Sequence, residues 1–267
     1  TQLIMKDLIS ENKIKEIAKN SIFDQSKAIK NLANFIDDSF LKSIEIIYNC
    51  KGRVVVTGVG KSAIIANKIV ATMNSTGTPS IFMHAGDAIH GDLGLIKKGD
   101  IIICISKSGN TAEIKALIPI LKQTKNPIVA ITGNKSSILA KNADFVINSY
   151  VEKEVCRNNL APTTSTTAQI VIGDAIAICL IELRKFTKDD FAKFHPGGIL
   201  GKKLFLKVKD LSKKNESPEV NPTSSLKDVI LEISHKRLGV TAVTLDKKIL
   251  GIITCLLYTS PSPRDPK

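Results

Sequence analysis

The sequence predicts an α/β fold, a doubly wound parallel sheet flanked by helices, with a smaller second unit behind it. Short runs of β-branched residues alternate with helical segments through the middle of the chain. These runs are apolar throughout, where a half-exposed strand would alternate apolar and polar residues. Strands of that kind need cover on both faces, as in a parallel sheet whose crossover helices lie above and below it.

The chain is expected to begin with helices. Apolar residues such as Leu32, Phe35 and Ile44 recur at roughly helical spacing, so amphipathic helices are predicted at about residues 6–19 and 25–49. Predicted strands follow at Arg53–Thr57, at a run ending in Pro79–Phe82, and at Ile101–Ile105, Pro127–Thr132 and Asp144–Ile147. Helices are predicted between and after these strands, near residues 61–75, 111–124, 136–142 and 166–186.

The composition changes beyond residue 198. Residues 212–225 form a polar segment with Pro and Ser, which predicts a linker. A helix is expected at 226–236, and strands are expected at Gly239–Leu245 and Ile249–Thr254. This second unit is too short to bury a core of its own.

The composition also excludes several classes of protein. The 267 residues are 43% apolar and carry a formal net charge of +13. The excess comes from lysines dispersed along the chain, whereas nucleic-acid readout favours clustered arginines, so no nucleic-acid partner is expected. No run of 18 uncharged apolar residues predicts a membrane span, and the charged N-terminus does not resemble a secretory signal, so a cytoplasmic location is expected. Five cysteines without a CxxC spacing argue against disulfides and a zinc cluster.

In an open parallel sheet, chemistry is expected in the loops at the carboxyl ends of the strands. The first such loop, Gly58–Ser62, fits a loose dinucleotide fingerprint through Ala63, but the acidic ribose ligand expected about 20 residues later is missing. No nicotinamide or flavin cofactor is therefore expected. The two glycines are explained either by a tight strand-to-helix turn or by a loop that projects Lys61 into a site.

The loop after the third strand, Ser106–Thr111, combines three hydroxyls and a glycine with the start of a helix. Backbone N–H groups, hydroxyl donors and the positive end of the helix dipole together suit a phosphate monoester. Glu113 lies in the first turn of that helix. It is either a capping-box glutamate with Asn110 as N-cap, or a carboxylate of the site.

Further polar residues lie in three other loops. His84 and His90 stand in a glycine-rich segment, where His84 is a weak candidate for an incidental divalent metal because no third ligand has a convincing spacing. Glu154 precedes a run of hydroxyls, residues 163–167, that is typical of an N-cap or of a polar site. His195 lies at a turn outside any amphipathic pattern.

Six motifs then occur in one order: GVGKS, STGTP, HGDLG, SKSGNTAE, NLAPTTSTT and HPGGILG. Over about residues 20–204 this chain resembles the sugar-isomerase (SIS) domain proteins, and within them the arabinose-5-phosphate isomerases. The resemblance implies a flavodoxin-like three-layer sandwich and a homotetramer without a cofactor or a required metal. It also implies interconversion of D-ribulose 5-phosphate and D-arabinose 5-phosphate through an enediol(ate), which feeds Kdo and lipopolysaccharide biosynthesis.

By position, the resemblance implies that Lys61, Glu113, Glu154 and His195 are catalytic. Lys61 would stabilise developing charge on oxygen, and His195 would open the sugar ring, reaching the site of a neighbouring subunit. Either Glu154 or Glu113 would move the proton between C1 and C2. The expected substrate-binding residues are Ser62, Gly77, Thr78, His84, His90, Ser106, Ser108, Thr111, Ser165 and Thr166.

The resemblance divides the chain into three parts. Residues 1–203 are expected to form the SIS domain with its N-terminal helices, and 204–254 the first part of a CBS domain. Residues 255–267 resemble a translated sequencing adapter and are expected to be an artefact. Lys107 and Asn110 depart from the family pattern in the phosphate loop. A non-catalytic sugar-phosphate sensor and an isomerase of another phosphosugar are the alternatives.

Overall fold

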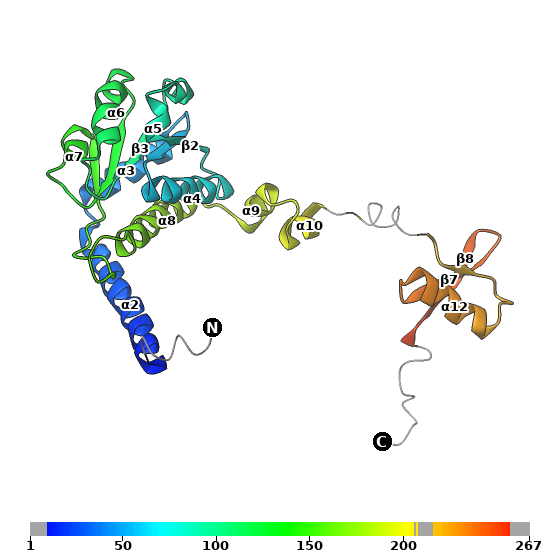
Figure 1. Ribbon diagram of the computed structural model, residues 1–267. Coiled ribbons are helices and arrows are strands. Elements are labelled where there is room, and N and C mark those ends of the chain that lie inside the picture. The colour runs from blue at the N-terminus through cyan, green and yellow to red at the C-terminus, as the bar shows by residue number, and fades with distance from the viewer. Residues whose placement is uncertain (1–9, 206, 208–215, 257–267) are drawn as a thin grey trace. The chain divides into compact units, whose positions relative to one another are not determined.

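The computed structural model describes residues 10–205, 207 and 216–256 (Figure 1). The chain divides into two compact units, residues 1–195 and 196–267, and each is described by itself. The first nine residues and the predicted artefact from 257 onward lie outside the described residues.

The first unit contains the predicted parallel sheet. Its five strands have the order β2-β1-β3-β4-β5, and every neighbouring pair is parallel. The strands are β1 (Val54–Gly58), β2 (Ser80–His84), β3 (Ile101–Ile105), β4 (Ile128–Thr132) and β5 (Phe145–Asn148). Every residue of β1, β3 and β4 is buried, which confirms that their continuous apolar runs are covered on both faces.

Helices cover the two faces of this sheet and complete a three-layer sandwich (Figure 1). Successive strand residues point to opposite faces, so Val54 and Val56 enter one core whereas Val55 enters the other. The first core is closed by α2 (Glu11–Leu32), α3 (Asp38–Asn49), α4 (Lys61–Ser75) and α8 (Thr164–Arg184). The second is closed by α5 (Ala85–Ala88), α6 (Ala112–Gln123) and α7 (Ile138–Asn142). Shorter elements are η1 (Ala33–Phe35), η2 (Asp92–Leu95) and α9 (Lys188–Phe194).

The boundary predicted between the N-terminal helices was wrong. The chain stays helical through residues 20–24, where the sequence has no glycine or proline, and breaks at residues 33–37. Asp37 causes the restart of the helix, because its carboxylate accepts hydrogen bonds from the backbone N–H groups of Ser39 (3.1 Å) and Phe40 (3.2 Å). The predicted helix at 25–49 is therefore two helices joined by η1.

Helix α8 crosses the first core. Among the described residues it is the one helix long and apolar enough to span a membrane, by length and composition only. It packs on α4, α2 and α3, its Gln169 is buried, and its Asp174 pairs with Lys68 of α4. This packing identifies α8 as the central helix of one layer of the sandwich.

The second unit contains α10 (Ile199–Phe205), α12 (Leu226–Lys236) and a three-stranded sheet of order β6-β7-β8. The strands are β6 (Glu219–Val220), β7 (Val240–Leu245) and β8 (Lys248–Thr254). Only a small buried cluster of Val220, Val229 and Ile233 forms among the described residues here, as expected for so short a segment. The assignment of residues 204–254 to part of a CBS domain stays a prediction.

Close packing of α4 on α8 depends on Gly173. A Cβ atom at this position would lie 2.3 Å from the Cδ1 atom of Ile69, which is fully buried. We expect Gly173→Ala to lower the free energy of unfolding by about 1–3 kcal/mol, because overpacking outweighs the better helix propensity of alanine. Chemical denaturation would measure this change. In an Ile69→Ala background, Gly173→Ala should lower the free energy of unfolding by less than it does in wild type. Equal stability of wild type and Gly173→Ala would contradict the packing argument.

Candidate active site

The carboxyl ends of the strands form one edge of the sheet, and the strand order reverses there between β1 and β3. The chain leaves β1 for β2 on one side, whereas β3, β4 and β5 follow on the other. Gly58, at the end of β1, is the register partner of both His84 and Ile105. Such a switch point leaves a crevice between loops that diverge to opposite faces, and ligands bind there.

The loop after β1 brings Lys61 to this edge. Gly60 is the N-cap of α4 with φ of 58° and ψ of −129°, a backbone conformation that favours glycine. Lys61 is exposed in the first turn and has no ion-pair or hydrogen-bond partner among the described residues. Ser62 donates instead to the side chain of Gln169 in α8, at 3.1 Å. Lys61 is thus presented to solvent at the switch point, whereas the Ser62 hydroxyl joins two helices.

The loop after β3 is held in a tight turn by a hydrogen bond to one of its own backbone N–H groups. Ser106 is buried, and its hydroxyl accepts from the N–H of Gly109 at 3.1 Å. Ser108 is exposed. Gly109 has φ of 63°, and a Cβ there would lie 2.2 Å from the Ser137 hydroxyl, so only glycine fits this turn. The hydroxyl of Thr111, the N-cap of α6, is buried without a partner among the described residues. A free hydroxyl at the start of a helix suits an anionic ligand.

The capping-box interpretation of Glu113 was wrong. The N-cap of α6 is Thr111, one residue after Asn110. Asn110 lies outside this cap because its side-chain oxygen accepts from the N–H of Ile138 in α7, at 2.9 Å. The half-buried Glu113 side chain has no hydrogen-bond or ion-pair partner among the described residues. Its carboxylate is therefore not used in capping.

Glu154 has the opposite environment. Its side chain is fully buried, and Oε1 lies 2.6 Å from the ammonium of Lys107. Oε2 accepts from the N–H of Thr163 (2.9 Å), the hydroxyl of Thr163 (3.2 Å) and the N–H of Ser165 (3.1 Å). Burial raises the pKa of this carboxyl, but the Lys107 ammonium and the hydrogen bonds of the loop outweigh it and lower the pKa to about 2. Glu154 is thus an ionised, fully bonded carboxylate.

The start of α8 carries the remaining predicted hydroxyls. The Ser165 side chain is buried, and its hydroxyl is one of the groups that lower the pKa of Glu154. Thr166 donates to the carbonyl oxygen of Thr163 at 2.8 Å, which is a local bond within the first turn. The Ser165 hydroxyl thus belongs to the surroundings of Glu154, whereas the Thr166 hydroxyl is engaged by the backbone.

The two predicted histidines lie at the end of β2 and in the turn that follows. His84 ends this strand at the carboxyl edge, and its Nδ1 lies 3.5 Å from a carboxylate oxygen of Asp87. His90 is exposed in the following turn. Within the part of the chain that the structure describes, no group of three or more His, Cys, Asp or Glu side chains is placed to hold a metal ion.

Gly77 and Thr78 are not brought to this edge. They lie between α4 and the first residue of β2, which puts them at the amino-terminal edge, opposite Lys61. There the guanidinium of Arg184 donates to the carbonyl oxygen of Gly77 (2.9 Å) and to the hydroxyl of Thr78 (2.5 Å). Within this chain both residues fasten the end of α8, and their expected contact with substrate stays a prediction.

His195 also lies away from the switch point of its own chain. Its ring stacks on Phe191 at 3.8 Å between centroids, and its Nδ1 lies 2.8 Å from the carbonyl oxygen of Phe191. Phe194, beside it, stacks on Phe186, whose ring covers Gly77 at the amino-terminal edge. Within this chain His195 is therefore not brought together with Lys61 and Glu113.

Two residues of the edge were not among the predicted site residues. Lys107 was noted only as a departure from the family pattern, although its place directly after a buried strand puts it at the carboxyl edge. Thr163 was seen only as one of a run of hydroxyls. Its bonds to Glu154 span nine residues of loop, and no sequence spacing reveals such a contact.

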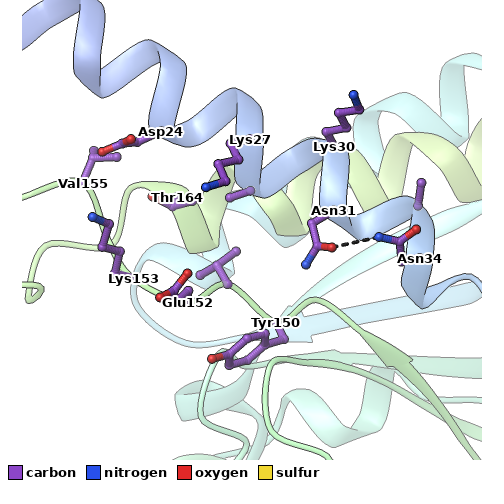
Figure 2. Close-up of a pocket in the computed structure, with 13 residues that line it drawn as sticks. Asp24, Lys27, Lys30, Asn31, Asn34, Tyr150, Glu152, Lys153, Val155 and Thr164 are labelled. Atoms are coloured by element: carbon purple, nitrogen blue, oxygen red, sulfur yellow. Dashed lines mark hydrogen bonds between the residues drawn. The ribbon is translucent and has the colours of Figure 1, made fainter.

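A cavity of about 990 Å³ lies beside this edge. It is lined by residues of α2 and by loop residues on both sides of Glu154 in the sequence, but not by Glu154 itself. Figure 2 shows it between α2 and the loop after β5, with Lys27 and Asn31 on the helix and Tyr150 and Glu152 on the loop. None of the predicted catalytic or substrate-binding residues lines it. The loop therefore has two faces, one buried through Glu154 and one open to this cavity.

Comparison with known proteins agrees with this arrangement. Residues 46–179 match the SIS domain family. The chain is 46% identical over 239 residues to the probable arabinose 5-phosphate isomerase of Haemophilus influenzae, across 90% of this chain and 71% of that protein. It is 49% identical over 232 residues to the arabinose 5-phosphate isomerase KdsD of Francisella tularensis, across 85% and 71%. The chain belongs to the arabinose 5-phosphate isomerase family.

The resemblance that the motifs indicated is thereby confirmed, and so is the predicted fold. A solved structure of Escherichia coli CFT073 c3406 in complex with arabinose 5-phosphate is 41% identical, has a TM-score of 0.68, and covers 70% of this chain and 100% of its own. A second solved structure, from Listeria monocytogenes, is 35% identical with the same TM-score and covers 70% of this chain and 99% of its own. The family relationship thus includes the whole sheet and its helices.

The environment of Glu154 predicts a pH dependence of stability for this family member. Its folded-state pKa of about 2 is below the ordinary 4.5, so its stabilising contribution is present above pH 4.5 and is lost as the pH falls toward 2. The contribution is on the order of 1–3 kcal/mol, because solvent around the half-exposed Lys107 screens the pair. Urea unfolding at pH 7 and at pH 3 should show a smaller loss on acidification for Glu154→Gln than for wild type. Equal losses would contradict the assignment.

Proposed function

We propose that this protein is an aldose–ketose isomerase that interconverts D-ribulose 5-phosphate and D-arabinose 5-phosphate through an enediol(ate). One observation carries the proposal: Lys61 and the loop Ser106–Thr111 flank the switch point between β1 and β3, where an α/β sheet binds its ligand. Membership of the arabinose 5-phosphate isomerase family supplies the substrate.

The phosphate group is bound by the loop after β3. Backbone N–H groups at the start of α6, the exposed Ser108 hydroxyl and the unpartnered Thr111 hydroxyl provide donors for its oxygens. Binding the phosphate there fixes one end of the substrate, so C1 and C2 of the opened sugar extend along the crevice toward Lys61. The energy of this remote contact positions the reacting carbons.

Glu113 is the base that moves the proton. It takes a proton from C1 of the ketose, so that a C1–C2 double bond forms and the carbonyl electrons move to the C2 oxygen. The O1 hydroxyl proton then passes to the C2 oxygen, C1 and O1 form the new carbonyl, and C2 takes the proton back from Glu113 to give the aldose. Glu113 has no partner among the described residues, whereas both oxygens of Glu154 are bonded and its pKa is lowered to about 2. A carboxylate stabilised to that degree is a poor proton acceptor, so Glu154 serves to hold the loops.

Lys61 stabilises the negative charge that develops on the substrate oxygen in the enediolate. It lies at the N-terminus of α4, where a cation is unfavourable, and no described carboxylate compensates it. Its position is thus explained by an anionic ligand. No metal or cofactor is needed for this proton transfer.

His195 opens the ring, acting on the site of a neighbouring copy in a homotetramer. Two features support an oligomer: His195 is remote from its own switch point, and α2 exposes Ile14, Ile17, Ile22 and Phe23, which are 43–66% exposed. Figure 1 shows the N-terminal half of α2 extending beyond the other helices of its unit.

Incubating the purified protein with D-ribulose 5-phosphate, and identifying the aldose by NMR, tests the proposed function. D-arabinose 5-phosphate should form, and unphosphorylated ribulose should react far more slowly. A different aldose phosphate would identify an isomerase of another phosphosugar. Binding without turnover would identify a sensor.

Lys61→Ala separates catalysis from stability. Loss of a cation aimed at developing oxyanion charge should lower kcat by roughly 10²–10³-fold. The melting temperature should stay within error or rise slightly, because a cation leaves the positive end of a helix dipole. Kinetics and calorimetry on the same sample would check both. A stable variant with wild-type kcat would remove Lys61 from the mechanism.

Glu113→Gln tests the choice of base. The variant should still bind D-arabinose 5-phosphate and should lose about 10²–10⁴-fold in kcat, because glutamine cannot accept the proton. Exchange of the C2 hydrogen with solvent D₂O, followed by NMR, should disappear with turnover. Retained exchange in Glu113→Gln would move the role of base to another carboxylate.

A further inference from the structure

Lys107 and Glu154 form an ion pair that joins two loops of the carboxyl edge. Lys107 lies inside the phosphate loop, between Ser106 and Ser108, whereas Glu154 lies beyond β5. Their 2.6 Å contact is the one bond to Glu154 Oε1 among the described residues. The backbone oxygen of Lys107 also accepts from the N–H of Gly133 (3.0 Å) in the loop after β4. Lys107 thus connects the loops that follow three neighbouring strands.

The two partners differ in exposure, and this difference decides what the pair does. The Glu154 side chain is 0% exposed and the Lys107 side chain is 46% exposed. The carboxylate is thus a fixed buried charge, while the ammonium keeps N–H groups toward solvent. Removing the ammonium would leave an uncompensated anion beside the phosphate loop, because the other described donors to Glu154 are uncharged.

A substrate phosphate carries a charge of about −2 near neutral pH, as other phosphate monoesters do. A buried anion beside its site repels it, and like-charge juxtaposition at an interface is costly. With the pair intact, the net charge of the two side chains is zero. The Thr111 hydroxyl and the N-terminus of α6 can then bind the phosphate without this repulsion.

We infer that Lys107 is a positioning residue whose ammonium balances the buried charge of Glu154 and so keeps the phosphate loop able to accept a dianionic phosphate group. The inference rests on the proposed function for the nature of the substrate. It assigns no proton transfer to Lys107. It explains how a carboxylate can be buried directly beside an anion site.

The test uses Lys107→Met, Lys107→Arg and the double variant Lys107→Met with Glu154→Gln. Calorimetric titration with D-arabinose 5-phosphate, and separately with inorganic phosphate, gives Kd at low and high ionic strength. Lys107→Met should raise Kd by about tenfold at low salt, with a smaller effect at high salt. Lys107→Arg and the double variant should both return Kd to within about threefold of wild type, because each restores a neutral pair. Lys51→Met, which removes an exposed lysine at the other edge of the sheet, is the matched control and should leave Kd unchanged.

The outcomes separate charge balance from other roles. A double variant that binds as weakly as Lys107→Met would overturn the inference, since Lys107 would then contact the phosphate directly. Unchanged binding by a folded Lys107→Met, or no binding of either probe by wild type, would also overturn it. If Lys107→Met does not fold, the double variant, which buries no charge, still decides the question. Binding of inorganic phosphate involves no turnover. If that probe gives the expected pattern in a protein that does not isomerise ribulose 5-phosphate, only the proposed function is rejected.

Discussion

Burial of the central strands on both faces is the constraint on which the rest of this structure depends. Because β1, β3 and β4 are covered above and below, every polar group of the site must come from the loops at the strand ends. The reversal of strand order between β1 and β3 sends two of these loops to opposite faces and opens a crevice between them. Lys61 and the Ser106–Thr111 loop are positioned by that geometry.

Around the crevice, the carboxylates have different tasks because their surroundings differ. Glu154 is surrounded by one ammonium, two backbone N–H groups and a hydroxyl, which keep it ionised and fix the start of α8. Glu113 is half-buried and has no partner in the described part of the chain, which leaves its oxygens available to a substrate. One glutamate thus stabilises the site and the other is available for chemistry, although both match the family pattern equally well in sequence.

The amino-terminal edge of the sheet is a region of structural contacts. Arg184 fastens α8 to Gly77 and Thr78, and Asp100 binds the guanidinium of Arg53 at 3.1 Å. The motif that contains Gly77 and Thr78 carries no information about which end of a strand it adjoins. In a parallel sheet, residues that precede a strand lie at the amino-terminal edge, and residues that follow a strand lie at the carboxyl edge.

By itself, the sequence determined the α/β class, the five strands and the loops that carry the chemistry, because apolar runs and glycine-hydroxyl clusters are local signals. It also determined the family, through motifs whose order survives without coordinates. The tertiary structure alone decided that Asn110 bonds α7, that Asp37 divides the first helices, and that Lys107 neutralises Glu154. Some of those contacts join residues up to 47 positions apart, and others depend on which backbone N–H group lies nearest to a side chain. Both the distant pairings and the nearest N–H groups are determined only when the loops pack together.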